Sequence, residues 1–240
     1  MPAARPRFDA ETLRFLRALK RNNRREWFNS HRDDYERRVR DPMTAIVERL
    51  AADFRSLAPE LVASPKISMY RIYRDTRFSE NKAPYKTHVA AVFPTRGLAK
   101  HEGAGLYFHI STDEVWIGGG MYAPQPPQLQ AVREHIAGNV RQLRAIVESP
   151  AFRRAITLQG EKLSRVPRGF PKDHVAAEYL KFRHFIAGAE FPAAFAASPK
   201  FYPTLLATFR AVLPLSRFLN APLIAAPAAR AAAVRAPKRA

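Results

Sequence analysis

The sequence contains no cysteine, and its 240 residues include only 10 glycines and 21 acidic residues against 40 lysines and arginines. Without cysteine, the chain can have no disulfide, no thiolate nucleophile and no cysteine-ligated zinc or iron–sulfur site. No run approaches the roughly 20 apolar residues of a membrane-spanning helix. The segment MPAARPRFDAET also lacks the apolar core of a secretory signal. We therefore expect a cytoplasmic protein with no membrane partner.

Several common functional motifs are also missing. The histidines show no metal-ligand spacing such as HxH or HExxH, so we predict no metal site. No G-x-S-x-G elbow and no phosphate-binding Walker loop occurs, which argues against the common hydrolase and P-loop NTPase classes. Cofactor and oligomeric state stay unknown at this level.

Positive charge is what the sequence has in excess. The formal net charge is +19 and the sequence pI is about 10.9. Such a charge attracts nucleic acids and other polyanions without any readout of base sequence. The alternative is compositional: arginine, alanine and proline are abundant together, as in chains from GC-rich genomes, and the charge would then only solvate the surface. Both interpretations stay open.

Apolar spacing predicts helices at both ends of the chain. Asp9 is the expected N-cap of the first helix, and Asp41 with Pro42 is expected to cap and begin the third. The predicted helices cover residues 9–20, 24–39, 43–57, 126–148, 150–158, 173–182 and 199–219.

The middle of the chain changes to the alternating pattern of strands. Residues 66–74, 86–93, 105–111 and 114–121 are the predicted strands, and the last two are expected to form an antiparallel hairpin. Gly118, Gly119 and Gly120 indicate a bulge or a close backbone approach. We therefore expect an α+β fold, with an antiparallel sheet flanked by N-terminal and C-terminal helices. One domain over 8–219 would precede a disordered basic tail over 220–240.

The stretch RIYRDTRFSENKAPYKTH, residues 71–88, concentrates cations among aromatic side chains. Arginine matches a phosphate or carboxylate with a planar fork of donors, and lysine adds a mobile charge. We therefore predict a site for a phosphorylated or carboxylated small molecule, whether or not the protein is an enzyme. The predicted ligand-binding residues are Arg71, Arg74, Arg77, Ser79, Lys82, Tyr85 and Lys86, with walls from Tyr70, Tyr73 and Trp116.

Asp75 and His88 are the weak catalytic candidates. Flanking cations lower the pKa of a carboxylate and weaken it as a base, so the expected role of Asp75 is to orient one arginine. His88 can exchange a proton near neutral pH. Two alternatives remain: a loop pinned by Arg–Asp and Arg–carbonyl bonds, and a nucleic-acid-binding module that uses the overall charge.

The same stretch resembles the domain of unknown function 2461 family, found mainly in bacteria and some fungi, whose signature runs R-D-x-R-F-S-x-x-K-x-P-Y-K. The matching residues are Arg74, Asp75, Arg77, Phe78, Ser79, Lys82, Pro84, Tyr85 and Lys86. The likeness extends to residues 22–36, 105–124 and 162–174. Members often carry an acidic residue before the loop lysine, where this chain has Asn81. The resemblance implies one domain type and a site, and no established activity.

Overall fold

The computed structural model describes residues 6–235, with side chains described through residue 224. The helices in chain order are α1 (Ala10–Arg21), α2 (Arg25–Ser30), α3 (Arg32–Tyr35), the π-helix η1 (Glu36–Arg40), α4 (Asp41–Leu57), α5 (Pro65–Ser68), α6 (Pro126–Gly138), α7 (Val140–Val147), α8 (Pro150–Ala155), α9 (Ala177–Leu180), the 3₁₀ helix η2 (Ala193–Ala197) and α10 (Phe201–Arg235). The strands are β1 (His88–Phe93), β2 (Gly105–Ser111), β3 (Glu114–Met121), β4 (Thr157–Gln159) and β5 (Phe185–Pro192).

The strands form one open antiparallel sheet in the order β1-β2-β3-β5-β4. The α+β prediction is therefore confirmed. Two of the predicted strands, 105–111 and 114–121, match β2 and β3 residue for residue, and β1 begins two residues later than predicted, at His88.

By its internal contacts the chain divides into two compact units. Unit 1 comprises residues 1–93, 107–118 and 189–210, and unit 2 comprises 94–106, 119–188 and 211–240. The boundaries fall inside β2, β3, β5 and α10, so single secondary-structure elements contribute residues to both units. One domain over 8–219 stays a prediction.

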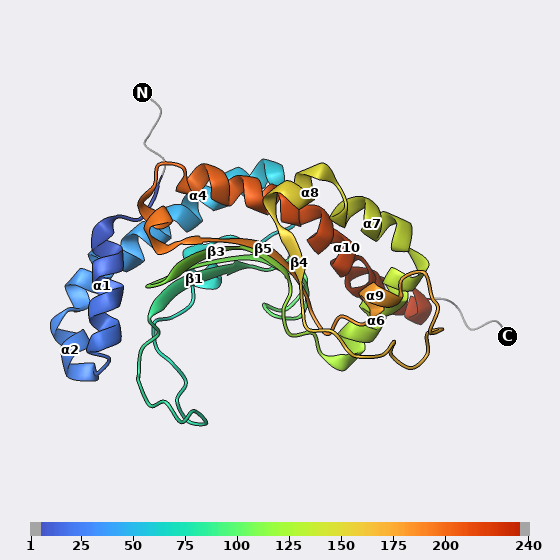
Figure 1. Ribbon diagram of the computed structural model, residues 1–240, viewed down its shortest axis with the longest axis horizontal. Helices are drawn as coiled ribbons and strands as arrows, with labels where there is room; N and C mark the ends of the chain where they lie inside the picture. The colour runs from blue at the N-terminus through green and yellow to red at the C-terminus, as the bar shows by residue number, and fades with distance from the viewer. Residues whose placement is uncertain (1–5, 236–240) are drawn as a thin grey trace. The chain divides into compact units, whose positions relative to one another are not determined.

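The core of unit 1 lies on one face of its strands. In Figure 1, α4 and the first turns of α10 cross this face. Phe54 of α4 and Phe209 of α10 both meet Phe93 of β1 edge-on, with ring centroids 5.3 and 5.7 Å apart. Inward-facing residues of β2 such as Phe108 are fully buried. Because successive side chains of a strand point to opposite faces, the residues between these buried ones lie on the other face of the sheet.

The N-terminal helices follow the predicted pattern only in part. Asp9 caps α1 as expected, since its carboxylate accepts from the Thr12 backbone N–H at 2.9 Å. The predicted helix 24–39 is interrupted: α2 ends at Ser30, α3 follows, and the chain passes through η1 into α4 without a break. The predicted cap at Asp41 is therefore wrong, because Arg40 before it already has helical dihedral angles.

The predicted strand 66–74 is wrong in its first half. The Ser64 side chain accepts from the Ile67 N–H, and Pro65 begins the short helix α5, which occupies Pro65–Ser68. Two isolated β-bridges join the residues after α5 to a later part of the chain. Met69 pairs with Ala91 of β1, and Tyr73 pairs with Tyr85, which precedes β1. Residues 69–74 and 84–91 thus form an irregular antiparallel ribbon, called the ribbon below.

Two predicted helices of unit 2 are divided or shortened in the structure. The predicted helix 126–148 divides into α6 and α7 at Asn139, whose φ and ψ are −130° and 31°. The predicted helix 173–182 contracts to α9. Strands β4 and β5 were not predicted; they pair antiparallel, with Leu158 opposite Ala187.

The close backbone approach predicted at Gly118–Gly120 is present in unit 2. Gly120 has a φ of +121°, and a Cβ atom there would collide with the Phe185 carbonyl oxygen. Only glycine adopts this conformation without strain at this position.

α10 extends well beyond the predicted end at residue 219, because its backbone is helical to Arg235. Asn220, the first residue of the predicted tail, is buried in unit 2. Its amide accepts from the Ala104 N–H at 2.7 Å and donates to Thr95 Oγ1 and the Ala104 carbonyl, each at 2.8 Å. Residues 236–240 of the predicted tail lie outside the described residues.

Candidate functional site

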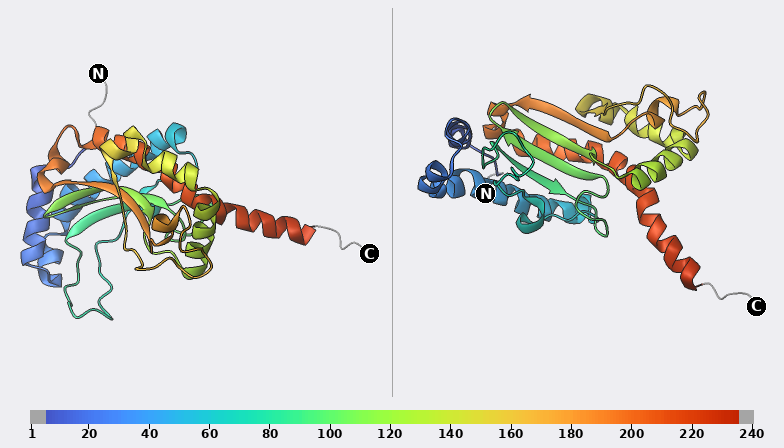
Figure 2. Two further views of the ribbon diagram at one scale, coloured as in Figure 1. Left: turned by 45° about the vertical axis from the view of Figure 1, so that its right-hand side comes forward. Right: turned by 90° about the horizontal axis from the view of Figure 1, so that it is seen from below.

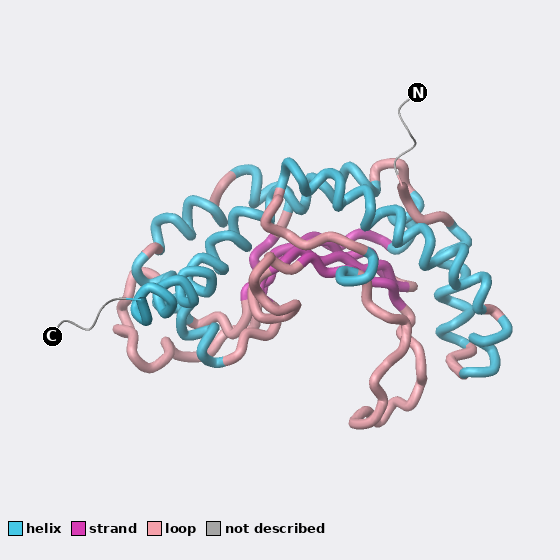
Figure 3. The backbone as a smooth tube through the Cα atoms, turned by 180° about the vertical axis from the view of Figure 1, so that it is seen from behind, coloured by secondary structure: helices cyan, strands magenta, loops and turns pink. Residues whose placement is uncertain are grey.

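The signature stretch forms the outer part of the ribbon. Three backbone bonds join its two sides: Tyr70 N–H to Ala90 O at 3.0 Å, Lys86 N–H to Ile72 O at 2.8 Å and Arg74 N–H to Pro84 O at 2.9 Å. Residues 75–83 close the ribbon as a loop, which Figure 3 shows projecting from the strands as an irregular segment. The signature therefore builds a protruding loop on a paired base.

Most cations of this loop bond to the loop itself. Arg74 donates to Ala83 O at 3.1 Å and to Ser79 Oγ at 3.4 Å. Lys82 donates to Thr76 O at 3.1 Å. This is the arrangement that the pinned-loop alternative predicts. A neutral carbonyl acceptor leaves the positive charge in place, however, so these bonds are compatible with anion binding.

Asp75 forms a two-pronged ion pair with Arg77 at the exposed end of the loop. The Arg77 Nε and Nη2 atoms donate to the two carboxylate oxygens at 3.1 and 2.8 Å, and the Arg77 backbone N–H donates at 3.2 Å. These bonds to Arg77 hold the pKa of Asp75 below its ordinary value. Asp75 therefore orients an arginine, as expected, and is a weak base.

The base of the ribbon packs against the turn between α1 and α2. The Asn23 amide donates to Tyr85 O at 2.9 Å and accepts from Tyr85 N–H at 3.0 Å. The Tyr85 ring stacks on Phe28 of α2, with centroids 4.1 Å apart, and Tyr73 lies 5.5 Å from Tyr85. These contacts fix the distance between α2 and the ribbon.

A pocket of about 290 Å³ lies between α2 and the ribbon. All of its lining residues belong to unit 1. They are Arg25, Asn29, Tyr73, Arg74, Thr76, Pro84 and Tyr85.

Arginines of α2 and α3 supply the positive charge on one side of this pocket. Arg25 is exposed and forms no hydrogen bond or ion pair with the described part of the chain. Arg32 lies beside the pocket, where its guanidinium is 3.5 Å from both the Tyr73 hydroxyl and Asn29 Oδ1. The hydrogen bond to Tyr73 raises the pKa of Arg32. The wall thus combines permanent charge with neutral donors.

The structure distributes the predicted site residues over three places. Arg74 and Tyr85 line the pocket. Asp75, Arg77, Ser79 and Lys82 lie in the loop, where the bonds described above hold them. Lys86 turns toward the sheet, 5.3 Å from the Tyr70 ring centroid, and donates to the Arg71 carbonyl at 2.9 Å; the Arg71 side chain is exposed.

Four lining residues were not predicted: Thr76 and Pro84, which lie inside the cationic stretch, and Arg25 and Asn29, which lie outside it. The last two belong to α2. Their spacing of four residues places them on one face of a helix, which was the available signal. Of the predicted walls, Tyr73 lines the pocket, whereas Trp116 lies on β3 beside Tyr107, with ring centroids 5.9 Å apart. His88 lies at the first position of β1.

Within residues 6–235, no helix combines the length and apolar character needed to cross a bilayer. In the same part of the chain, no group of three or more His, Asp or Glu side chains is placed to hold a metal ion.

Residues 11–218 match the family model described as conserved hypothetical protein (DUF2461). Because this match covers most of the chain, the protein belongs to that family, and the resemblance seen in the signature is confirmed. No curated protein and no solved structure gives a significant match.

Proposed function

We propose that the pocket between α2 and the ribbon binds the anionic group of a phosphorylated or carboxylated small molecule. The observation that carries the proposal is the meeting of Arg25, which lacks a described partner, with Arg74 in the wall of one pocket. Two arginines in the lining of one pocket favour a phosphate or carboxylate over a neutral group.

The remaining lining suggests the kind of molecule that carries the anion. Tyr73, Tyr85 and Pro84 offer ring surfaces, and Asn29 and Thr76 offer neutral polar groups. A volume of about 290 Å³ lies at the lower end of the range of small-molecule sites, roughly 300 Å³ and above. We therefore expect a compact metabolite rather than a large cofactor.

Thermal unfolding tests the proposal directly. The probes are glucose 6-phosphate, uridine monophosphate and succinate, since a ligand that binds the folded state raises the unfolding midpoint by mass action. Arg25→Ala should weaken binding of the active probe about 10-fold to 100-fold, the effect of losing one charge-assisted bond.

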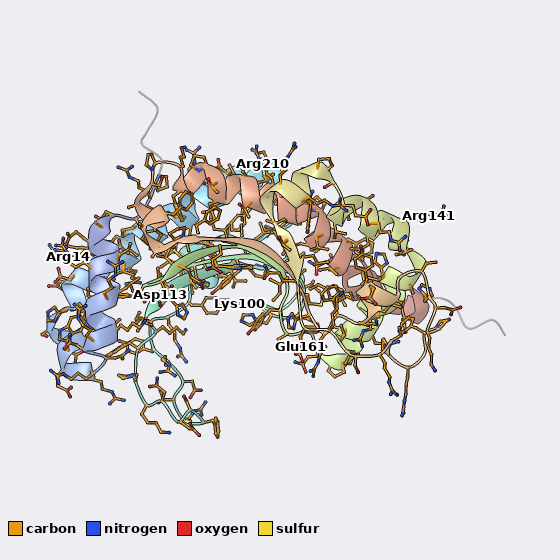
Figure 4. The ribbon with its side chains drawn as sticks, in the orientation of Figure 1. Arg14, Lys100, Asp113, Arg141, Glu161 and Arg210 are labelled. Carbon is orange, nitrogen blue, oxygen red and sulfur yellow. The ribbon has the colours of Figure 1, made fainter. Side chains whose placement is uncertain are left out.

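Arg210→Ala is the matched control. Arg210 is also an exposed arginine of unit 1, but it projects from α10 on the helical side, away from the strands (Figure 4). The Arg210→Ala protein should bind the active probe with the affinity of the unchanged protein. No stabilisation by any probe, or equal weakening in both variants, would reject the pocket as the site.

Enzymatic activity is not part of the proposal for this pocket. Asp75, between the lining residues Arg74 and Thr76, pairs with Arg77 in the exposed loop. Neither Asp75 nor His88 lines the pocket. We therefore propose binding as the function of this pocket and assign it no reaction.

A nucleic-acid-binding role is the second candidate, and the net charge of +19 favours it. Binding would then weaken steeply with salt and decline evenly as individual arginines or lysines are removed. Electrophoretic mobility shifts of a single-stranded RNA at low and moderate salt test this role. Absence of a shift at low salt would exclude it.

A further inference from the structure

The sheet face opposite the core of unit 1 carries a separate group of ionisable and aromatic side chains. Along β2, Leu106, Phe108 and Ile110 are fully buried, whereas Tyr107 and His109 between them are half-buried. Seen from below, no helix of unit 1 covers these strands (right panel of Figure 2). The His109 side chain keeps 19% of its surface exposed, so this face is reachable from solvent in part.

His109 is held by a carboxylate on the neighbouring strand. Its Nε2 atom lies 3.0 Å from Glu114 Oε1 of β3. The ionised carboxylate accepts from the Nε2–H, which fixes the ring orientation and leaves Nδ1 free to carry a second proton. Glu114 therefore holds the His109 ring in one orientation, and Nδ1 is the ring atom through which His109 can pass a proton to a substrate.

His88 of β1 is suited to the opposite role. Its ring lies 5.9 Å from that of His109 and makes no hydrogen bond with the described residues. Burial, then the charges of His109 and Lys86, lowers the pKa of His88 to about 4. His88 is therefore neutral at pH 7 and can accept a proton, although so low a pKa makes it a modest base.

Cysteine and serine, two common protein nucleophiles, are not available on the described part of this face. The chain contains no cysteine. The Ser111 hydroxyl is fully engaged, because it accepts from the N–H groups of Asp113 and Glu114 and donates to Glu114 O. An acid and a base without a protein nucleophile act best on a substrate that brings its nucleophile with it.

We propose that His88, His109 and Glu114 form an acid–base site that cleaves the phosphodiester bond of a ribonucleotide chain. His88 takes the proton of the ribose 2′-hydroxyl, and the 2′-oxygen bonds to phosphorus. The bond from phosphorus to the 5′-oxygen breaks, and that oxygen takes a proton from the His109 imidazolium. The products are a 2′,3′-cyclic phosphate and a free 5′-hydroxyl, so atoms and charges balance without a further reactant.

The surroundings of this site fit such a substrate. Tyr107 and Trp116 are half-buried on the same face and can stack against bases. Lys86 lies near enough to lower the pKa of His88, and it can therefore also act on a nearby phosphate. The net charge of +19 concentrates a polyanion at the surface. The inference uses none of the residues that line the pocket, and it shares only the polyanion affinity of the second candidate function.

The test uses the full chain with uridylyl-(3′→5′)-adenosine, and chromatography separates the products. We expect adenosine and uridine 2′,3′-cyclic phosphate, and no cleavage of the 2′-deoxyuridine analogue, which lacks the nucleophile. His88→Gln and His109→Gln should each slow cleavage about 100-fold or more, the usual contribution of a general acid or base. His135→Gln in α6 is the matched control and should cleave at the unchanged rate.

Glu114 is a positioning residue, so its variant needs a different readout. Glu114→Ala should lower kcat for the dinucleotide and leave KM unchanged, because the carboxylate orients the proton donor and does not itself bind the substrate. Thermal unfolding of each variant shows whether it is folded.

No cleavage by the unchanged protein overturns the proposal, and so does cleavage at the unchanged rate by the folded His88→Gln or His109→Gln variant. Arg25→Ala separates this inference from the pocket: it should cleave normally even where it no longer binds the small molecule. RNA that is bound but not cleaved would overturn the acid–base site and leave the second candidate function standing.

Discussion

The side-chain amide of Asn23 forms a reciprocal pair with the backbone of Tyr85, donating to its carbonyl at 2.9 Å and accepting from its N–H at 3.0 Å. Sixty-two residues separate the two in the sequence. The two bonds resemble the paired backbone bonds between antiparallel strands. The Asn23 side chain can form both because its amide carries a donor and an acceptor on separate atoms. The Asn23–Tyr85 pair connects the turn before α2 to the ribbon.

We expect Asn23→Ala to lower the free energy of unfolding by about 1–3 kcal/mol, because it leaves a partly buried donor and acceptor of Tyr85 unpaired. Urea unfolding measures the difference. Asn29→Ala is the control: its side chain accepts only one long bond, at 3.5 Å, and its loss should change stability little. Equal effects of the two variants would contradict the assigned role of Asn23.

The two signature arginines at positions 74 and 77 should differ in their effect on the loop. Arg74 bonds to Ala83 and Ser79 across the loop, whereas Arg77 pairs with the nearby Asp75. Arg74→Ala should therefore speed amide hydrogen exchange across residues 79–83. Arg77→Ala should leave exchange there unchanged, and peptide-level exchange measurements distinguish the two. Faster exchange in both variants would contradict this division.

His88 should make stability depend on pH in acid. Its pKa falls from 6.5 to about 4 on folding, chiefly because burial disfavours the imidazolium. Between these two values the unfolded chain binds a proton that the folded chain does not, so stability is full above pH 6.5 and declines as pH falls toward 4. The loss is about 3 kcal/mol at most, which solvent screening at a half-buried ring reduces to on the order of 1 kcal/mol.

Urea unfolding between pH 4 and about pH 7 tests this expectation. His88→Gln cannot titrate, so its stability should decline less across this window than that of the unchanged protein. Parallel curves for the two proteins would show that the His88 pKa is not lowered.

Two glycines of unit 2 should respond in opposite directions to alanine. Gly120 combines a φ of +121° with a Cβ position blocked by the Phe185 carbonyl, so Gly120→Ala should destabilise by about 2 kcal/mol or more. Gly138 ends α6 with no atom within 4 Å of its Cβ position, and Gly138→Ala should stabilise by about 0.5–1 kcal/mol. Thermal unfolding measures the change in stability of each variant. A Gly120→Ala protein as stable as the unchanged one would contradict the close approach of Gly120 to the Phe185 carbonyl.

The predictable part of the fold is the part that local sequence determines. β2 alternates buried and half-buried residues, β3 follows it after a short turn, and both match their predicted bounds. Asp9 caps α1 through a bond to Thr12, three residues away. β5 has the sequence FIAGAEFP, whose small residues do not alternate, so its strand depends on neighbours distant in sequence. The predicted strand extended from the tyrosine- and isoleucine-rich residues 69–73 back to residue 66, but Ser64 and Pro65 begin a helical turn there.

The candidate site also combines residues that the local sequence predicts with residues that only the fold brings together. The signature located Arg74 and Tyr85, which line the pocket. Arg25 and Asn29 come from α2, and their approach to the ribbon depends on the Asn23–Tyr85 pair and on the stacking of Phe28. The cations of the loop were read as open to a ligand because the sequence does not show which backbone carbonyls they reach.

β4 ends the sheet and consists of three residues, of which Thr157 and Gln159 are exposed. An outer strand is a template on which another chain can add by backbone pairing. Three residues offer too few free groups for such an addition to be stable. The shortness of β4 therefore limits self-association through this edge of the sheet. Lengthening the strand by a few apolar residues should promote aggregation.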